Sequence, residues 1–133
     1  LVRSRGLGDV YKRQILETIK SAEKILQNGT SLMVFPEGAR TYTGHMADFK
    51  KGAFLIAHQL QMPVVPLTID GPFNVLPRTG KLLHWHPMRL TIHKPIYPSG
   101  KNEENLQRIM EESYREIEKD LPEKYKGKQY NPD

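Results

Sequence analysis

Two short motifs hold the residues of this sequence best suited to bind an anion. Glu37, Gly38 and Arg40 stand in the run Phe-Pro-Glu-Gly-Ala-Arg, and Lys50 and Lys51 stand in the run Phe-Lys-Lys-Gly. An arginine guanidinium matches the oxygens of a phosphate, lysines add flexible positive charge, and a glycine lets the backbone approach a ligand closely. These residue types at this spacing predict a phosphate-binding site.

A purely structural explanation of the same residues stays open. A Pro-x-Gly turn commonly joins a strand to a helix, and an acid close to an arginine is commonly a surface ion pair. The two motifs by themselves therefore do not decide between a phosphate site and an ordinary turn.

The residues around the motifs predict a strand, a loop and a helix that would position them. Residues 32–35 are a short apolar run that stops at a proline, which predicts a buried strand. An apolar run after the lysines predicts a helix over 51–61. The strand would carry Glu37 and Arg40 at its carboxyl end, and the lysines would lie at the helix N-terminus, where free backbone N–H groups favour an anion.

The remaining periodic segments complete an α/β pattern. Strand, helix and strand within a short stretch of sequence form a βαβ unit with parallel strands and a right-handed crossover. Pro66 lies inside the second of these strands and predicts an edge or a bulge there. The sequence therefore predicts an α/β fold with a mixed, largely parallel sheet flanked by helices. The predicted elements are helices over 15–28, 51–61 and 103–121 and strands over 32–35, 64–69 and 88–92.

Residues 71–87 are predicted to be a loop that is too apolar to be freely solvated. We expect this loop to cover part of the sheet or to line a groove for an apolar ligand. His84 and His86 could place two imidazoles on one side of a strand, as a metal site needs. Because no third ligand is evident, no metal site is predicted.

Three motifs in order resemble the glycerolipid acyltransferase family, in particular the 1-acylglycerol-3-phosphate acyltransferases. They are Phe35–Arg40, Phe49–Ala53 and Pro63–Leu67, and the resemblance covers about residues 15–96. It implies a glycerolphosphate acyltransferase-like fold. In this sequence Ala39 replaces the threonine that is usual in the family, so a hydrogen bond from that hydroxyl is lost.

The resemblance also implies roles for individual residues. The phosphate of the acceptor would be bound by one group of residues, and a second group would shape the substrate site. The phosphate-binding group is Glu37, Gly38, Arg40, Lys50 and Lys51, and the shaping group is Phe35, Pro36, Gly52 and Pro66.

The family's catalytic motif, a histidine followed after four residues by an aspartate, does not occur in this sequence. The five histidines are His45, His58, His84, His86 and His93, and no aspartate stands five positions after any of them. Since the family motif precedes the Glu-Gly-Thr-Arg run, we expect this chain to be the C-terminal part of the domain, with the fold incomplete at its N-terminus and no catalytic residue present.

The resemblance implies acyl transfer from acyl-CoA or acyl carrier protein to 1-acylglycerol-3-phosphate (lysophosphatidic acid), giving phosphatidic acid without a cofactor or metal. It also implies a location at the cytoplasmic face of the cell membrane, peripheral or anchored through the part that is missing here. Two alternatives remain. The first is another acceptor, such as glycerol-3-phosphate, a lysophospholipid or an aminolipid. The second is a non-catalytic phosphate-binding module, which the missing motif favours and the absence of a Gly-x-x-x-x-Gly-Lys loop disfavours.

Composition and charge limit the classes of fold and function that this chain can belong to. The chain has 133 residues, no cysteine and a formal net charge of +5, of which residues 1–14 hold +3. One domain without disulfides or thiolate metal sites fits these values, and a nucleic-acid partner does not, because no basic stripe runs through the domain. No apolar run reaches the roughly 18 residues of a membrane span. We expect a non-native or disordered leader over 1–14, the acyltransferase part over 15–122 and a flexible tail over 123–133.

Overall fold

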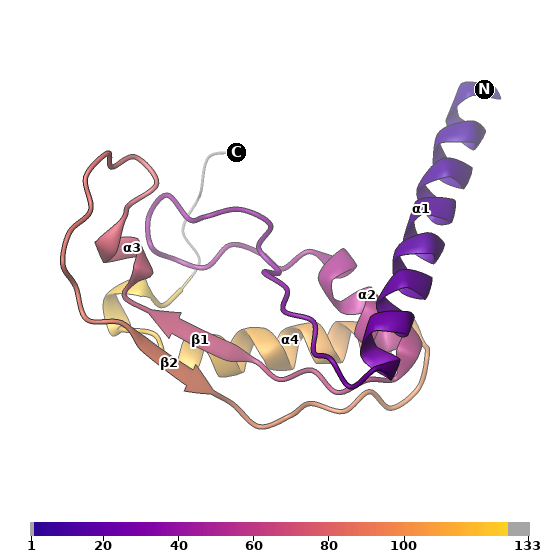
Figure 1. The fold of residues 1–133 in the computed structure, drawn as a ribbon. Helices are drawn as coiled ribbons and strands as arrows, with labels where there is room; N and C mark the ends of the chain where they lie inside the picture. Colours follow the sequence, from indigo (N-terminus) through magenta and orange to yellow (C-terminus); the bar gives the residue numbers. More distant parts are fainter. Residues whose placement is uncertain (1, 128–133) are drawn as a thin grey trace. The chain divides into compact units, whose positions relative to one another are not determined.

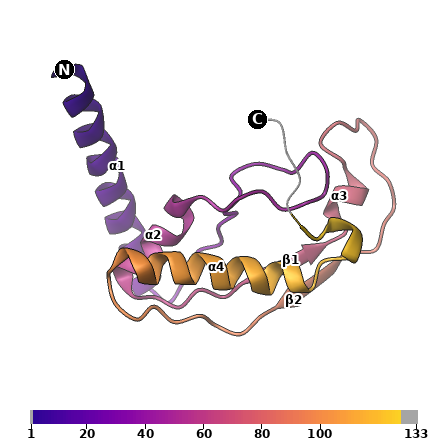
Figure 2. The ribbon, with the colours of Figure 1, turned by 180° about the vertical axis from the view of Figure 1, so that it is seen from behind.

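The computed structural model describes residues 2–127, with only the backbone described over residues 2–12. The chain divides into two compact units, Leu1–Val34 and Phe35–Asp133. Figures 1 and 2 show the elements from opposite sides. In chain order these elements are α1 (Val2–Gln27), α2 (Lys51–Leu60), β1 (Leu67–Asp70), α3 (Pro72–Val75), β2 (Arg89–Ile92), α4 (Glu103–Lys119) and the 3-10 turn η1 (Glu123–Tyr125).

The first unit is built on α1. This helix contains the amphipathic segment predicted from residue 15 onward, but it begins at Val2, within the predicted leader. It ends where the sequence predicts, because Gly29 adopts a φ of +77° and its N–H donates to the Leu26 carbonyl at 3.1 Å. That residues 1–14 are non-native stays a prediction.

The core of the second unit lies between α2 and α4. Both helices match their predicted positions, and the side chain of Asn102 caps α4 by accepting from the Asn105 N–H at 2.9 Å. The buried apolar cluster consists of Phe54, Ile96, Leu106 and Ile109. These residues come from α2, from the segment after β2 and from α4, so the cluster joins the two helices to the chain that follows the sheet.

The sheet of the described residues has two antiparallel strands, β1 and β2, in a register that pairs Leu67 with Ile92 and Asp70 with Arg89. A separate bridge joins Val64 to Ile96. Pro66 lies between the bridge and the ladder and cannot donate a backbone hydrogen bond, so β1 begins at Leu67 and not at residue 64, where the predicted strand begins.

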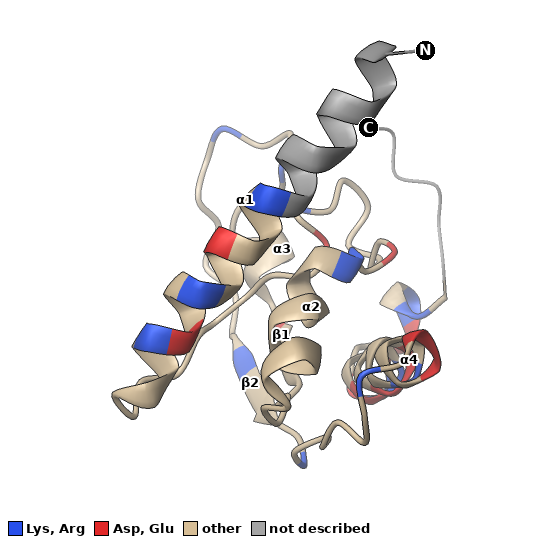
Figure 3. Cartoon of the chain, turned by 90° about the vertical axis from the view of Figure 1, so that its right-hand side faces the viewer, with Lys and Arg blue, Asp and Glu red and all other residues tan. Residues whose placement is uncertain are grey.

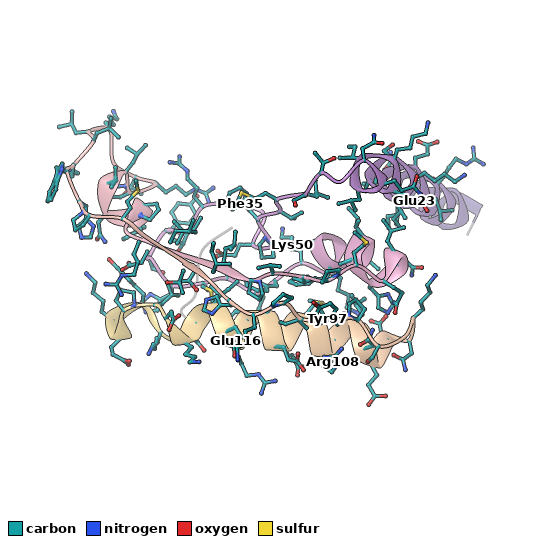
Figure 4. All side chains as sticks on the ribbon, turned by 60° about the horizontal axis from the view of Figure 1, so that its bottom comes forward. Glu23, Phe35, Lys50, Tyr97, Arg108 and Glu116 are labelled. Carbon is teal, nitrogen blue, oxygen red and sulfur yellow. The ribbon has the colours of Figure 1, made fainter. Side chains whose placement is uncertain are left out.

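Side chains tie the sheet and the segment after it to α4. The Thr68 hydroxyl of β1 donates to the Ile117 carbonyl at 3.0 Å. Arg108 donates from Nη2 to the Tyr97 carbonyl at 2.8 Å and pairs with Glu112 on its own helix. Figure 4 shows Tyr97 beside α4, which carries Arg108 and Glu116.

The predicted largely parallel sheet is not formed by the described residues, because residues 32–35 do not form a strand. Leu32, Met33, Val34 and Phe35 are 45%, 61%, 44% and 69% exposed, whereas a buried strand was predicted. An apolar run becomes a strand only when a neighbouring strand satisfies its backbone groups, and no described segment pairs with this one. The predicted βαβ unit and its parallel strand ends are therefore absent from this part of the molecule.

Candidate functional site

The two charged motifs meet through their backbones. The Lys50 N–H donates to the Pro36 carbonyl at 2.9 Å, and the Gly38 N–H donates to the Phe35 carbonyl at 3.2 Å, which closes a tight turn. Figure 4 shows Phe35 and Lys50 on the segments that lead from α1 to α2. The turn that carries Glu37 and Gly38 is thereby fixed beside the start of α2.

Gly38 supplies a backbone conformation and a space that other residues would not. Its φ is +75°, and a Cβ at this position would lie 3.3 Å from Cε and 3.6 Å from Nζ of Lys50. The Lys50 side chain therefore lies across the turn, with its ammonium group close to the backbone of Gly38. This places one positive charge over the Glu-Gly turn.

Glu37 holds the loop that follows Arg40. Its Oε2 accepts a hydrogen bond from the Ala47 N–H at 2.8 Å. Burial of this half-buried carboxyl raises its pKa above the ordinary value of 4.5, and the Ala47 hydrogen bond opposes the increase. Among the described residues Glu37 forms no ion pair with Arg40, so the interpretation of the two as a surface ion pair is not supported.

Arg40 is exposed, and its guanidinium has no hydrogen-bond or ion-pair partner within residues 2–127. Its backbone is held instead, because Arg78 donates from Nη1 to the Arg40 carbonyl at 2.8 Å. The Arg78 guanidinium also lies 3.9 Å from the centre of the Tyr42 ring. Sequence reasoning missed Arg78 and Tyr42, because neither stands in a motif and only the fold brings them together.

The loop after Arg40 is packed against the C-terminal turn. Gly44 has a φ of +89°, and a Cβ there would lie 2.4 Å from Cε1 of Tyr125, so the tyrosine ring occupies that space. The Tyr125 hydroxyl donates to Oδ1 of Asn74 at 2.9 Å. Tyr125 falls in the segment predicted to be a flexible tail. Of that segment the structure describes residues 123–127, which are η1 and the two residues after it. Residues 128–133 lie outside the described chain.

Other predicted site residues have contacts that do not involve the Glu37–Gly38 turn. Lys51 pairs with Glu103 at the start of α4, and this contact lowers the pKa of the Glu103 carboxyl. Pro66 is buried, and its carbonyl accepts from the His93 N–H at 3.0 Å. Gly52 is exposed in the first turn of α2, with no atom within 4 Å of where its Cβ would be. The geometry therefore brings Pro36, Gly38 and Lys50 together, with Glu37 in the same turn and Arg40 two residues after it in the sequence. Lys51 and Pro66 have other partners.

Three of the five histidines, His45, His58 and His93, are held in packed surroundings, whereas His84 and His86 are exposed. His58 is buried, and its Nε2 lies 2.9 Å from the Asn102 carbonyl. His93 lies 2.8 Å from the Thr68 hydroxyl and 3.6 Å from a Glu116 oxygen. This grouping looks like a hydroxyl–histidine–acid arrangement. Thr68, however, is 1% exposed and donates to a backbone carbonyl, so no substrate reaches its hydroxyl.

The arrangement of the gathered residues can bind a phosphate. An exposed guanidinium, the Lys50 ammonium and the N-terminus of α2 lie along one continuous stretch of backbone, and the first turn of α2 contains no acid. Within residues 2–127 no three His, Cys, Asp or Glu side chains are grouped so that they could hold a metal ion.

Comparison with known proteins identifies the family of this chain. The sequence model of the acyltransferase family matches residues 9–70. A chloroplastic 1-acyl-sn-glycerol-3-phosphate acyltransferase of Brassica napus is 39% identical over 88 residues, which are 65% of this chain and 26% of that protein. A probable 1-acyl-sn-glycerol-3-phosphate acyltransferase of Mycoplasma pneumoniae is 30% identical over 79% of this chain and 42% of its own length.

A solved structure agrees with these matches. The crystal structure of the 1-acyl-sn-glycerophosphate acyltransferase PlsC from Thermotoga maritima superposes with a TM-score of 0.65 at 33% identity, over 76% of this chain and 43% of that one. This chain belongs to the acyltransferase family. As an acyltransferase-family chain it spans less than half the length of these relatives. Its fold is that of PlsC over the matched part, and the predicted resemblance is confirmed.

Proposed function

We propose that this chain carries the acceptor-phosphate site of an enzyme that transfers a fatty acyl group to 1-acylglycerol-3-phosphate, giving phosphatidic acid. The observation that carries the proposal is the exposed guanidinium of Arg40, which has no partner among the described residues and follows the Lys50–Gly38 turn. A surface arginine in an ordinary turn would pair with the nearest acid, but Glu37 is held by Ala47 instead. Arg40 is thereby left available for a phosphate.

In the proposed reaction the free hydroxyl oxygen of the acceptor attacks the thioester carbonyl of acyl-CoA or acyl carrier protein. The new ester C–O bond forms, the C–S bond breaks, and the hydroxyl proton ends on the thiol that leaves. The chain spans less than half of its relatives and contains no His-x-x-x-x-Asp motif, so the proposal assigns the general base to residues outside this sequence. The described residues bind and orient the phosphate end of the acceptor.

The proposal extends to the donor and the location. No cofactor or metal is required, since the thioester already carries an activated acyl group. We propose that the whole protein works at the cytoplasmic face of a membrane, because the acceptor and the product are membrane lipids. None of the described helices has the length and apolar character needed to cross a bilayer.

A binding experiment on this chain tests the phosphate assignment. A short-chain lysophosphatidic acid is titrated into the protein by calorimetry, with glycerol-3-phosphate and a nucleotide as comparison ligands. Loss of the hydrogen bonds between Arg40 and the phosphate in Arg40→Ala should weaken binding roughly 10- to 100-fold, and Arg40→Lys should recover part of the loss. Arg115→Ala removes an exposed arginine of α4 as the matched control. Equal affinity in folded Arg40→Ala protein, or tighter binding of the nucleotide, would contradict the proposal.

A further inference from the structure

The segment between α3 and β2 exposes its largest apolar side chains to solvent. Leu82, Leu83 and Trp85 are 73%, 75% and 92% exposed, and Met88 is 66% exposed. The sequence predicts that residues 71–87 cover part of the sheet or line an acyl-chain groove. The exposed side chains of Leu82, Leu83 and Trp85 do not cover the sheet, and the groove alternative stays a prediction. We name residues 80–88 the docking loop. Contiguous exposed apolar side chains of this size mark a surface that meets a partner.

The stretch of sequence that contains the docking loop carries only positive charge. Residues 71–102 contain five Lys or Arg residues and no Asp or Glu. The rest of the chain contains fifteen basic and fifteen acidic side chains, so the whole formal net charge of +5 is the charge of this segment. Figure 3 colours Asp and Glu red, and α4 carries several of these acidic residues. An anionic partner is therefore electrostatically matched to the docking loop. The five basic residues of 71–102 are Arg78, Lys81, Arg89, Lys94 and Lys101.

The docking loop is fixed at its base. The His84 N–H donates to the Val75 carbonyl of α3 at 2.8 Å, and the Gly80 N–H donates to the Pro77 carbonyl at 2.9 Å. The loop ends in β2, where Arg89 stands opposite Asp70 of β1 in the strand register. Figures 1 and 2 both show the chain between α3 and β2 extending beyond the end of the sheet. A partner can therefore reach Leu82, Leu83 and Trp85 without rearrangement of the sheet.

We propose that the docking loop inserts Leu82, Leu83 and Trp85 into the interfacial region of an anionic lipid bilayer. Tryptophan prefers the boundary between lipid headgroups and acyl chains, and leucines gain by leaving water. Lys81 directly precedes the apolar residues and can contact a lipid phosphate while its aliphatic stem lies along the apolar surface. This surface is distinct from the acceptor-phosphate site and needs no membrane-spanning helix.

Arg78 links the docking loop to the acceptor site. Arg78 lies two residues before Gly80, and it holds the Arg40 carbonyl at 2.8 Å and the Tyr42 ring at 3.9 Å. A docked loop would therefore keep Arg40 close to the headgroup layer. This consequence rests on the proposed function, since it matters only if Arg40 binds a lipid phosphate. Lipid binding by the docking loop does not rest on the proposed function.

Trp85 is the single tryptophan of the chain, so its fluorescence reports on the loop itself. The purified chain is mixed with vesicles of phosphatidylcholine alone, or of equal parts phosphatidylcholine and phosphatidylglycerol. With the anionic vesicles we expect a blue shift of Trp85 emission and quenching by lipids brominated near the headgroup. Lys81→Gln should weaken partitioning about fivefold, and Leu82→Glu/Leu83→Glu more than about tenfold. Because these side chains are exposed, the variants should melt as the parent does.

Tyr97→Glu is the matched control, because Tyr97 is 66% exposed and lies outside the docking loop. It should bind anionic vesicles nearly as well as the parent chain. Unchanged Trp85 emission, equal binding of neutral and anionic vesicles, or equal losses in Tyr97→Glu and the double leucine variant would overturn the proposal. A blue shift without lipid that grows with protein concentration, together with a dimer mass by light scattering, would assign the loop to a second copy of the chain instead and would also overturn it. Acyl transfer is not measured, so failure here is separate from failure of the proposed reaction.

Discussion

The Lys50 N–H and the Pro36 carbonyl form a hydrogen bond of 2.9 Å, and this bond joins two motifs that are separated by a loop in the sequence. It sets the Glu37–Gly38 turn against the start of α2 and brings the Lys50 side chain over Gly38. The neighbouring Lys51 points instead toward α4 and pairs with Glu103. Two adjacent lysines of the same motif therefore have different surroundings, which gives the first prediction.

Lys50→Ala should weaken binding of short-chain lysophosphatidic acid roughly fivefold, because it removes a charge at close range in a solvated site. Lys51→Ala should leave both the affinity and the melting temperature nearly unchanged, since its ion pair with Glu103 is exposed. Titration calorimetry and a melting curve measure the two effects. Equal losses of affinity in the two variants would mean that both lysines contact the phosphate.

Gly44→Ala should destabilise the chain by about 2 kcal/mol or more. The residue has a φ of +89°, which costs an L-residue about 1–2 kcal/mol, and the added Cβ would overlap the Tyr125 ring. Gly52→Ala is the control within α2, where the added methyl group meets no atom within 4 Å. It should stabilise the chain by up to about 1 kcal/mol through helix propensity. Denaturant unfolding of both variants measures the difference, and a neutral Gly44→Ala would contradict the packing of η1 on this loop.

The raised pKa of Glu37 predicts that the unfolding free energy of the chain depends on pH. Burial raises the pKa of this carboxyl in the folded chain above 4.5, so the unfolded chain releases the proton first as pH rises. Ionisation then favours the unfolded state. The unfolding free energy of the parent chain should therefore fall relative to that of Glu37→Gln as pH rises from about 4.5 toward neutrality. The glutamine keeps an oxygen that can accept from the Ala47 N–H.

Denaturant unfolding of both proteins across this pH range measures the difference. Glu17→Gln, which changes an exposed carboxylate of α1, controls for the loss of a surface charge. A stability difference for Glu37→Gln that follows that of Glu17→Gln at every pH would contradict the assignment of burial as the dominant cause.

The 133-residue chain should show no acyl transfer from labelled acyl-CoA to lysophosphatidic acid. No histidine in it stands before an aspartate at the family spacing, and His45, His58 and His93 are held in packed surroundings. Extraction of labelled phosphatidic acid is the measurement. Turnover that disappears in His84→Ala or His86→Ala would show instead that the exposed histidines of the docking loop perform the chemistry.

The sequence alone determined the features that depend on local chemistry. Helices α2 and α4 follow from apolar periodicity and from the Asn102 cap, and the late start of β1 follows from the missing N–H of Pro66. The family follows from three motifs whose residue types and order are written in the sequence, and the comparisons confirm it. Each of these features is set within a few residues of chain.

Only the tertiary structure decided what depends on a distant partner. Residues 32–35 have the composition of a buried strand, but a strand needs a second chain segment to satisfy its backbone, and no described segment does so. Lys50 and Lys51 differ in their contacts because Glu103 pairs with Lys51 alone. The backbone of Arg40 is held by Arg78, which is distant in the sequence. The exposure of Leu82, Leu83 and Trp85 depends on where the Val75 carbonyl fixes the loop. Apolar composition reports that a side chain gains by leaving water, whereas the surface that receives it is set by the packing of the whole chain.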